Sequence, residues 1–366
     1  MRPVPDRHPL LRARKLLLFA AVSLSLPGCS GRGDSFTPVA ATLDLSPDAQ
    51  MAVAGWVAEA FGTPSLPSPH PVLPITWGAT TAVETAEEAK PVSETLRRGR
   101  ALYAAQCIQC HGVDGAGDGA TASALNPRPR DFRLGIFKYT STGPAEKARR
   151  RDIERTLRGG LAGTAMPRYP AVPKEDLDAV IEYVRWLAMR GECETGVAFD
   201  LAYASDIGGD EIDAAVDESG ERSIGRVASR WVAAEQADAV VRAEVERPAM
   251  TAESIARGEA LFRSGPTSCV SCHGPGARGD GPELDLPHAV PSEAAGTKRP
   301  GLWDAWGRRV RPRDLTKGIY RGGGDPTDLF RRIKVGVKGT PMPGAGGRLG
   351  DDEIWDLVNY VISLAE

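Results

Sequence analysis

The sequence predicts an all-α protein that contains two similar helical units in tandem. Apolar residues recur at helical spacing in two segments, near 177–187 and near 354–364, and form one stripe in each. Short phrases of sequence also recur in the same order in both halves of the chain. Alternating patterns typical of strands are weak throughout. We therefore expect two helical domains joined by a partly helical linker.

Each unit is expected to begin with one helix and to end with another. Residues 98–103 (Arg-Gly-Arg-Ala-Leu-Tyr) match residues 257–262 (Arg-Gly-Glu-Ala-Leu-Phe), which places an opening helix in each half. Ser93 and Thr251 are candidate N-caps of these helices. Gly, Pro and Arg are frequent further along and indicate loops. Besides the two closing helices, we expect helices over 93–105 and 252–264 and shorter ones near 151–158 and 326–335.

Cys-x-x-Cys-His occurs twice, once in each half, as Cys107 and Cys110 before His111 and as Cys269 and Cys272 before His273. Two thiols at this spacing can bond to the vinyl groups of a c-type haem, and the following imidazole can bind its iron. A structural zinc site or a thioredoxin-like redox pair would account for the thiols alone. Neither explains the histidine after each pair. The motifs therefore predict two covalently attached haem c groups.

A second repeated phrase supplies the other axial ligand. Gly-Thr-x-Met-Pro follows each haem motif, with Met166 in the first copy and Met342 in the second. A lone methionine is usually a core residue. A methionine that lies in a Gly-rich loop before a proline, ahead of a closing helix, instead suits a ligand that reaches the iron from the face opposite histidine. We predict His/Met ligation of both irons.

Two arginines repeat in a Pro-Arg-Asp setting and have two possible partners. Arg130 and Arg313 carry guanidinium groups, which suit the carboxylates of haem propionates. Each could equally pair with the aspartate that follows it, Asp131 or Asp314. The sequence leaves both interpretations open.

The amino-terminal residues 1–28 are typical of a signal peptide. A basic stretch precedes a short apolar run at 16–22, too short to cross a bilayer as a helix. The run ends near Leu26-Pro27-Gly28-Cys29, which resembles the lipobox of bacterial lipoproteins. An ordinary secretory signal near a cysteine is the alternative. We expect lipidation of Cys29, and so a lipid anchor in a bacterial membrane and an extracytoplasmic (periplasmic-side) location.

The remaining segments complete the predicted organisation. Net charge is −3, which gives no reason to expect nucleic acid as a partner. Cys193 has no partner among the six cysteines and is expected to be a spare thiol. The expected divisions after the signal are 29–92, a tether with one short helix and a proline-rich connector; 93–192, haem domain 1; 193–250, an acidic, partly helical linker; and 251–366, haem domain 2.

Together these motifs resemble the class I c-type cytochromes, and specifically a tandem dihaem member. The resemblance covers about 93–190 and 251–366. It implies three or more helices around each haem, with one haem edge exposed for electron exchange. The second unit departs from the family by an insertion near 285–308 that contains Trp303 and Trp306. This insertion could shield the second haem or form a partner surface.

The function that follows is electron transfer rather than enzymatic catalysis. We expect a membrane-anchored dihaem cytochrome that relays single electrons between a redox protein donor and a redox protein acceptor. Two closed His/Met irons offer no position for a substrate. A dihaem peroxidase-like enzyme is the alternative, because such enzymes also carry two haem motifs. A haem subunit of a larger respiratory or dehydrogenase complex is a further one.

Overall fold

The computed structural model describes residues 34–75, 86–204, 211–291, 293 and 296–365. Helices dominate these residues, and the expected all-α class is confirmed. None of the described helices is both long and apolar enough to cross a membrane. The expected signal peptide and Cys29 lie outside the described residues. In chain order the helices are α1 (Ala40–Leu43), α2 (Pro47–Phe61), α3 (Ala86–Gln106), α4 (Ile108–His111), α5 (Arg150–Gly159), α6 (Lys174–Tyr203), α7 (Glu211–Glu235), α8 (Ala252–Ser264), α9 (Cys269–His273), α10 (Pro326–Val335) and α11 (Asp351–Ser363).

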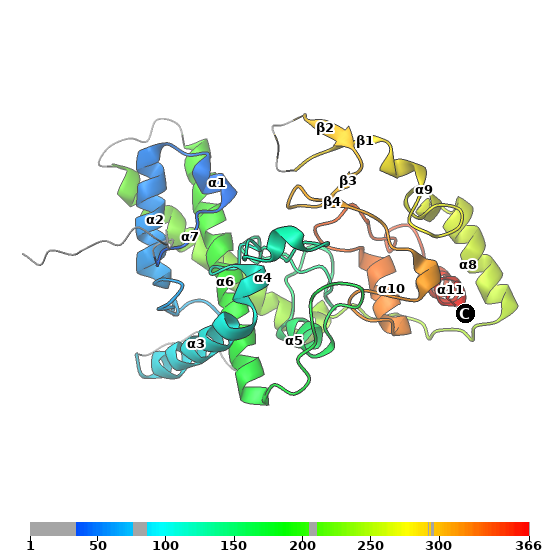
Figure 1. The fold of residues 1–366 in the computed structure, drawn as a ribbon, viewed down its shortest axis with the longest axis horizontal. Coiled ribbons are helices and arrows are strands. Elements are labelled where there is room, and N and C mark those ends of the chain that lie inside the picture. The colour runs from blue at the N-terminus through cyan, green and yellow to red at the C-terminus, as the bar shows by residue number, and fades with distance from the viewer. Residues whose placement is uncertain (1–33, 76–85, 205–210, 292, 294–295, 366) are drawn as a thin grey trace, which may run out of the picture. The chain divides into compact units, whose positions relative to one another are not determined.

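The two units repeat the same order of helices. In the first unit the opening helix α3 packs against the closing helix α6, and α5 packs against α6 as well. In the second unit α8 packs against α11, and α10 packs against α11 (Figure 1). Each short helix that holds a haem motif, α4 or α9, follows its opening helix directly. The sequence repeat is therefore also a structural repeat.

Each unit has its own apolar core. The first core includes Trp186 and Leu187 of α6, and the second includes Phe330 of α10 and Leu357 of α11. The apolar stripes of the closing helices supply Leu187 and Leu357 to these cores. The opening helices contact a neighbouring face of each closing helix, at Ala179 in α6 and at Asp356 in α11.

The segments before and between the units are more ordered than expected. Residues 34–75, expected to form a tether with one helix, contain α1 and α2 and contribute Trp56 and Phe61 to the first core. The closing helix α6 runs on to Tyr203, past the expected boundary at 192. The linker helix α7 packs along α6 and against α2, and it buries Trp231 in the same core (Figure 1). The apolar faces of the helices in both segments are thus buried against the first unit.

The two candidate helix caps behave differently. The Thr251 hydroxyl accepts a hydrogen bond from the amide of Ser254, so the predicted cap of α8 is confirmed. Ser93 lies inside α3, which begins at Ala86, so its prediction as a cap was wrong. Residues 86–90, all good helix formers, extend the helix ahead of Ser93, and Pro91 is accommodated within it.

The insertion in the second unit forms strands that the sequence analysis did not predict. The strands form two antiparallel hairpins, β1 paired with β2 and β3 paired with β4. They are too short for the period-2 pattern to stand out in the sequence. Their bounds are β1 Pro287–Ala289, β2 Lys298–Pro300, β3 Leu302–Trp303 and β4 Arg309–Val310, and 3₁₀ turns occur at Ala122–Ala124, Ala237–Ala239, Pro282–Leu284 and Leu315–Lys317.

Candidate functional site

All eight predicted haem-binding side chains line one continuous cavity of about 1620 Å³. The cavity extends across residues of both units. It exceeds the volume of roughly 300–1,000 Å³ that is usual for a site holding one small molecule. The side chains concerned are Cys107, Cys110, His111 and Met166 from the first unit and Cys269, Cys272, His273 and Met342 from the second.

The two histidines are held in the same way. Nδ1 of His111 lies 3.1 Å from the main-chain carbonyl oxygen of Arg130, and Nδ1 of His273 lies 3.2 Å from that of Arg313. A proton on Nδ1 that is donated to this carbonyl leaves Nε2 free as the metal-binding nitrogen. The ring of Phe132 stacks on His111 with 4.6 Å between centroids.

Burial keeps both imidazoles neutral at neutral pH. It lowers the pKa of His111 to about 4, and it lowers the pKa of His273 from its ordinary value. The neutral imidazole is the form that binds a metal. Protonation state and hydrogen bonding therefore both suit an axial ligand.

The methionine loops are also equivalent. The Thr164 hydroxyl accepts from the amide of Met166 at 3.1 Å and donates to the carbonyl of Leu161 at 2.8 Å. In the second unit the Thr340 hydroxyl accepts from the amide of Met342 at 3.3 Å and donates to a carbonyl in the same manner. The threonine of the repeated phrase thus fixes the turn that presents each methionine to the cavity.

The five cysteines within the described residues fall into two groups. The four haem-motif thiols are free and partly exposed toward the cavity. Cys193 is free and fully buried in α6, where burial raises the pKa of its thiol well above the ordinary value. Only the first group is placed to bond a porphyrin edge.

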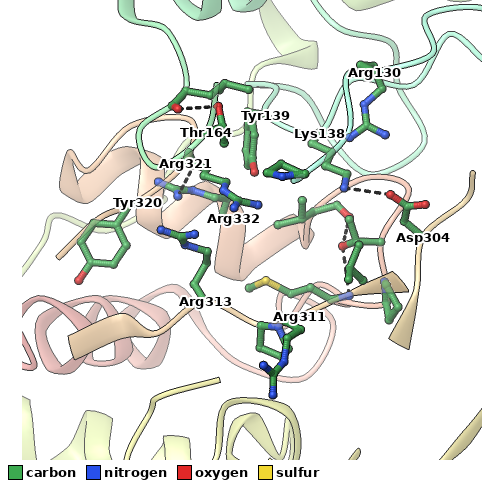
Figure 2. Close-up of a pocket in the computed structure, with 18 of the residues that line it drawn as sticks. Arg130, Lys138, Tyr139, Thr164, Asp304, Arg311, Arg313, Tyr320, Arg321 and Arg332 are labelled. Carbon is green, nitrogen blue, oxygen red and sulfur yellow. Dashed lines mark hydrogen bonds and ion pairs between the residues drawn. The ribbon is translucent and has the colours of Figure 1, made fainter. Parts of the chain in front are cut away.

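Many cationic side chains line the cavity, and five of them are called here the basic cluster: Arg130, Lys138, Arg313, Arg321 and Arg332 (Figure 2). Burial lowers the pKa of Arg130 to about 10 and of Lys138 to about 8, and it also lowers the pKa of Arg321 and Arg332. The Nε atoms of Arg313 and Arg321 are buried without a hydrogen-bond partner. Uncompensated buried donors of this kind indicate an anionic ligand.

The aspartates beside the two repeated arginines have other partners. Asp131 accepts hydrogen bonds from Arg133, at 2.9 Å from Nε and 2.8 Å from a terminal nitrogen. Asp314 pairs with Lys317 at 3.3 Å. Neither Arg130 nor Arg313 therefore forms an ion pair with the aspartate that follows it, although Asp304 acts on Arg130 through its charge and Arg313 donates to the carbonyl of Ile319. The carboxylates of porphyrin propionates match the basic cluster in charge and in hydrogen-bonding capacity, so the residues present fit haem.

Sequence reasoning missed several residues of this site. Asp304 pairs with Lys138, and Tyr139 lies beside the guanidinium groups of Arg321 and Arg332 (Figure 2). No motif or matching pair marks these positions in the sequence. His288 also lines the cavity, and its Nε2 lies 3.1 Å from a carboxylate oxygen of Glu283.

Comparison with known families agrees with this geometry. Residues 96–188 match the family model for cytochrome c. Residues 253–361 match the model for cytochrome c oxidase, cbb3-type, subunit III. The chain is a c-type cytochrome. It carries tandem haem domains, and its cytochrome c domains imply covalently bound haem c and a role in electron transfer.

One solved structure extends the comparison beyond the haem domains. The chain is similar, with 25% identity and a TM-score of 0.54, to a chain of the reducing HAO-like protein complex of Kuenenia stuttgartiensis. The match covers 74% of this chain and 96% of that chain. No curated protein matches this chain significantly.

Proposed function

We propose that this cytochrome carries two haem c groups, each with one histidine and one methionine on iron, and relays single electrons between extracytoplasmic redox proteins. The observation that carries the proposal is the matched pair of ligand sets, His111 with Met166 and His273 with Met342, around one cavity. A shared cavity supports electron passage from one haem to the other within the chain.

The protein attaches, orients and encloses the two haems. When bound, the haems supply the one-electron redox chemistry. The thiols of each Cys-x-x-Cys pair hold the porphyrin covalently, and the two carbonyl-bound histidines keep their Nε2 atoms toward the cavity. The basic cluster binds the propionates. Cations near haem disfavour the ferric form, because that form carries one more positive charge, so the cluster raises the reduction potentials.

Two closed irons distinguish this proposal from a peroxidase. An enzyme that acts on peroxide needs an iron position that can open. Here both methionine loops have the same threonine-fixed turn, so neither unit is set apart as the open one.

The amino terminus supports a membrane location. Lipidation of Cys29 would provide two or three acyl chains, and about 0.8 kcal/mol per buried methylene makes two chains sufficient for stable anchoring. The test is fractionation of cells that produce the full chain. We expect wild-type protein in the membrane fraction and Cys29→Ser protein in a soluble or precursor form. Equal membrane retention of both would contradict the anchor.

Membership of a complex is a second candidate. The similar chain from Kuenenia stuttgartiensis belongs to a protein complex, and nearly all of its length is matched. Purification of the native protein under mild conditions tests this. Stable stoichiometric partners would favour a subunit, whereas a lone chain would favour a free carrier.

The first test of the central proposal is an absorption spectrum of the matured protein, with a haem assay. We expect two haems per chain, a sulfur–iron band in the oxidised form and no change when carbon monoxide is added to the reduced form. Carbon monoxide binding to one haem would show an open iron and would overturn the electron-carrier assignment in favour of the peroxidase.

A further inference from the structure

The insertion of the second unit reaches the histidine loop of the first. Trp306 lies between β3 and β4, and its Nε1 donates to the carbonyl oxygen of Asp131 at 3.2 Å. Arg308 donates to the carbonyl oxygen of Pro129 at 2.5 Å. Each of these two contacts joins residues more than 170 positions apart in the sequence. Together they hold the backbone on either side of Arg130.

Trp306 also holds the Arg130 side chain. The guanidinium carbon of Arg130 lies 3.5 Å from the centroid of the Trp306 ring, within the range of a strong cation–π contact. Asp131 forms its ion pair with Arg133 instead, so Asp131 and Asp304 act on the guanidinium of Arg130 only through their charge. The ring thus fixes the positive charge of Arg130 at the edge of the cavity.

Arg130 acts on the first haem site through two of its parts. Its carbonyl accepts from Nδ1 of His111, and its guanidinium belongs to the basic cluster that faces the cavity (Figure 2). Trp306 contacts both the peptide that follows Arg130 and the Arg130 side chain. The second unit therefore determines where the carbonyl and the guanidinium of Arg130 lie.

We propose that Trp306 is a positioning residue through which the second unit sets the reduction potential of the first haem. This inference rests on the proposed function, since it requires two haems with His/Met ligands. Trp306 keeps the Arg130 charge beside the first haem site. Without the ring, that charge moves toward solvent, where water screens it, and the potential of the first haem falls.

The test is a spectroelectrochemical titration of the dihaem protein. Replacing Met342 with histidine lowers the midpoint potential of the second haem, because a thioether stabilises ferrous iron better than imidazole does. The redox wave at the higher potential (the upper wave) then belongs to the first haem. In this background we expect Trp306→Ala to lower the upper wave by about 59 mV, a tenfold change in its one-electron equilibrium constant.

Three further variants make the test specific. Trp303→Ala removes a tryptophan of the same insertion. Its Nε1 donates a solvent-exposed hydrogen bond to the carbonyl oxygen of Arg299, and the variant should move neither wave. Arg130→Gln should lower the upper wave as far as Trp306→Ala does, and the double variant should add little. Trp306→Phe keeps a ring face for Arg130 and should give a smaller shift.

The outcomes separate this inference from the proposed function. If Met342→His moves no wave, the ligand assignment fails. If it moves one wave but Trp306→Ala and Arg130→Gln leave the other unchanged, or raise it, the positioning role of Trp306 is wrong. An equal effect of Trp303→Ala would also overturn it, because the shift would then reflect the insertion as a whole.

Discussion

Gly99 in α3 lies directly against the main-chain carbonyl of Ala179 in α6, so closely that a Cβ atom at Gly99 would overlap the carbonyl oxygen. The second unit repeats this relationship between Gly258 in α8 and the carbonyl of Asp356 in α11. The opening and closing helices thus cross backbone to backbone. This crossing explains why glycine recurs at the same place in both copies of the repeat.

The first prediction concerns stability. Gly99→Ala and Gly258→Ala should each destabilise its own unit by about 1–3 kcal/mol, because the added methyl group forces the crossing helices apart. Thermal unfolding of the matured protein, followed by circular dichroism, measures the effect.

Gly55 provides the matched control. It lies inside α2, and a Cβ atom there would meet nothing within 4 Å. Gly55→Ala should therefore stabilise the protein by about 0.5–1 kcal/mol through helix propensity. Equal changes in stability for Gly99→Ala, Gly258→Ala and Gly55→Ala would contradict the close crossing of the helices.

Haem number provides a second prediction. Cys107→Ala combined with Cys110→Ala should reduce the haem content from two to one per chain, because no thiol remains to bond the first porphyrin. Mass spectrometry of the denatured chain measures the covalently bound haem. Cys193→Ala serves as control and should keep both haems, since Cys193 is buried within α6 away from the cavity. Retention of two haems by the double variant would contradict the assigned motif.

Much of the fold could be predicted because its signals are local or repeated. The stripe around Leu357 gives α11, and Thr251 marks the start of α8. The ligand candidates were equally visible, since Met166 and Met342 share a phrase whose threonine has a structural role in each loop.

What could not be predicted depends on contacts between distant segments. Trp56 gives no sign in the sequence that it packs in the first haem unit's core. From the sequence alone, Lys138 is an ordinary surface lysine. Only the fold brings Asp304 of the insertion to within 3.3 Å of it. Such partners are brought together only by the tertiary fold, and spacing along one segment does not reveal them.

The third prediction tests the methionine ligands singly. Met166→Ala and Met342→Ala should each abolish half of the sulfur–iron band, lower one midpoint potential and allow carbon monoxide to bind one reduced haem, because the alanine leaves an axial position open. Met51→Ala is the control, since Met51 is 67% exposed on α2 and lies outside the cavity. Carbon monoxide binding unchanged from wild type in Met166→Ala would exclude Met166 as a ligand.

Lys138 gives the protein a titratable charge within the basic cluster. Its ammonium group lies 3.3 Å from Asp304 and faces the cations Arg130 and Arg321. Burial lowers its pKa to about 8, with those cations adding to the effect and Asp304 opposing it. The folded protein therefore loses this proton at lower pH than an unfolded chain does, whose lysine pKa is about 10.4.

The fourth prediction follows from the sign of that charge. A protonated Lys138 disfavours ferric haem and raises the potential, so the potential should fall as pH rises through about 8, where the proton is lost. Lys138→Met should have a lower potential than wild type at pH 6 and should show no such fall. Lys298→Met, at an exposed position on β2 away from the cavity, should keep the wild-type profile. Potentiometric titration between pH 6 and pH 10 distinguishes these curves, and a fall that persists in Lys138→Met would assign the proton to another group.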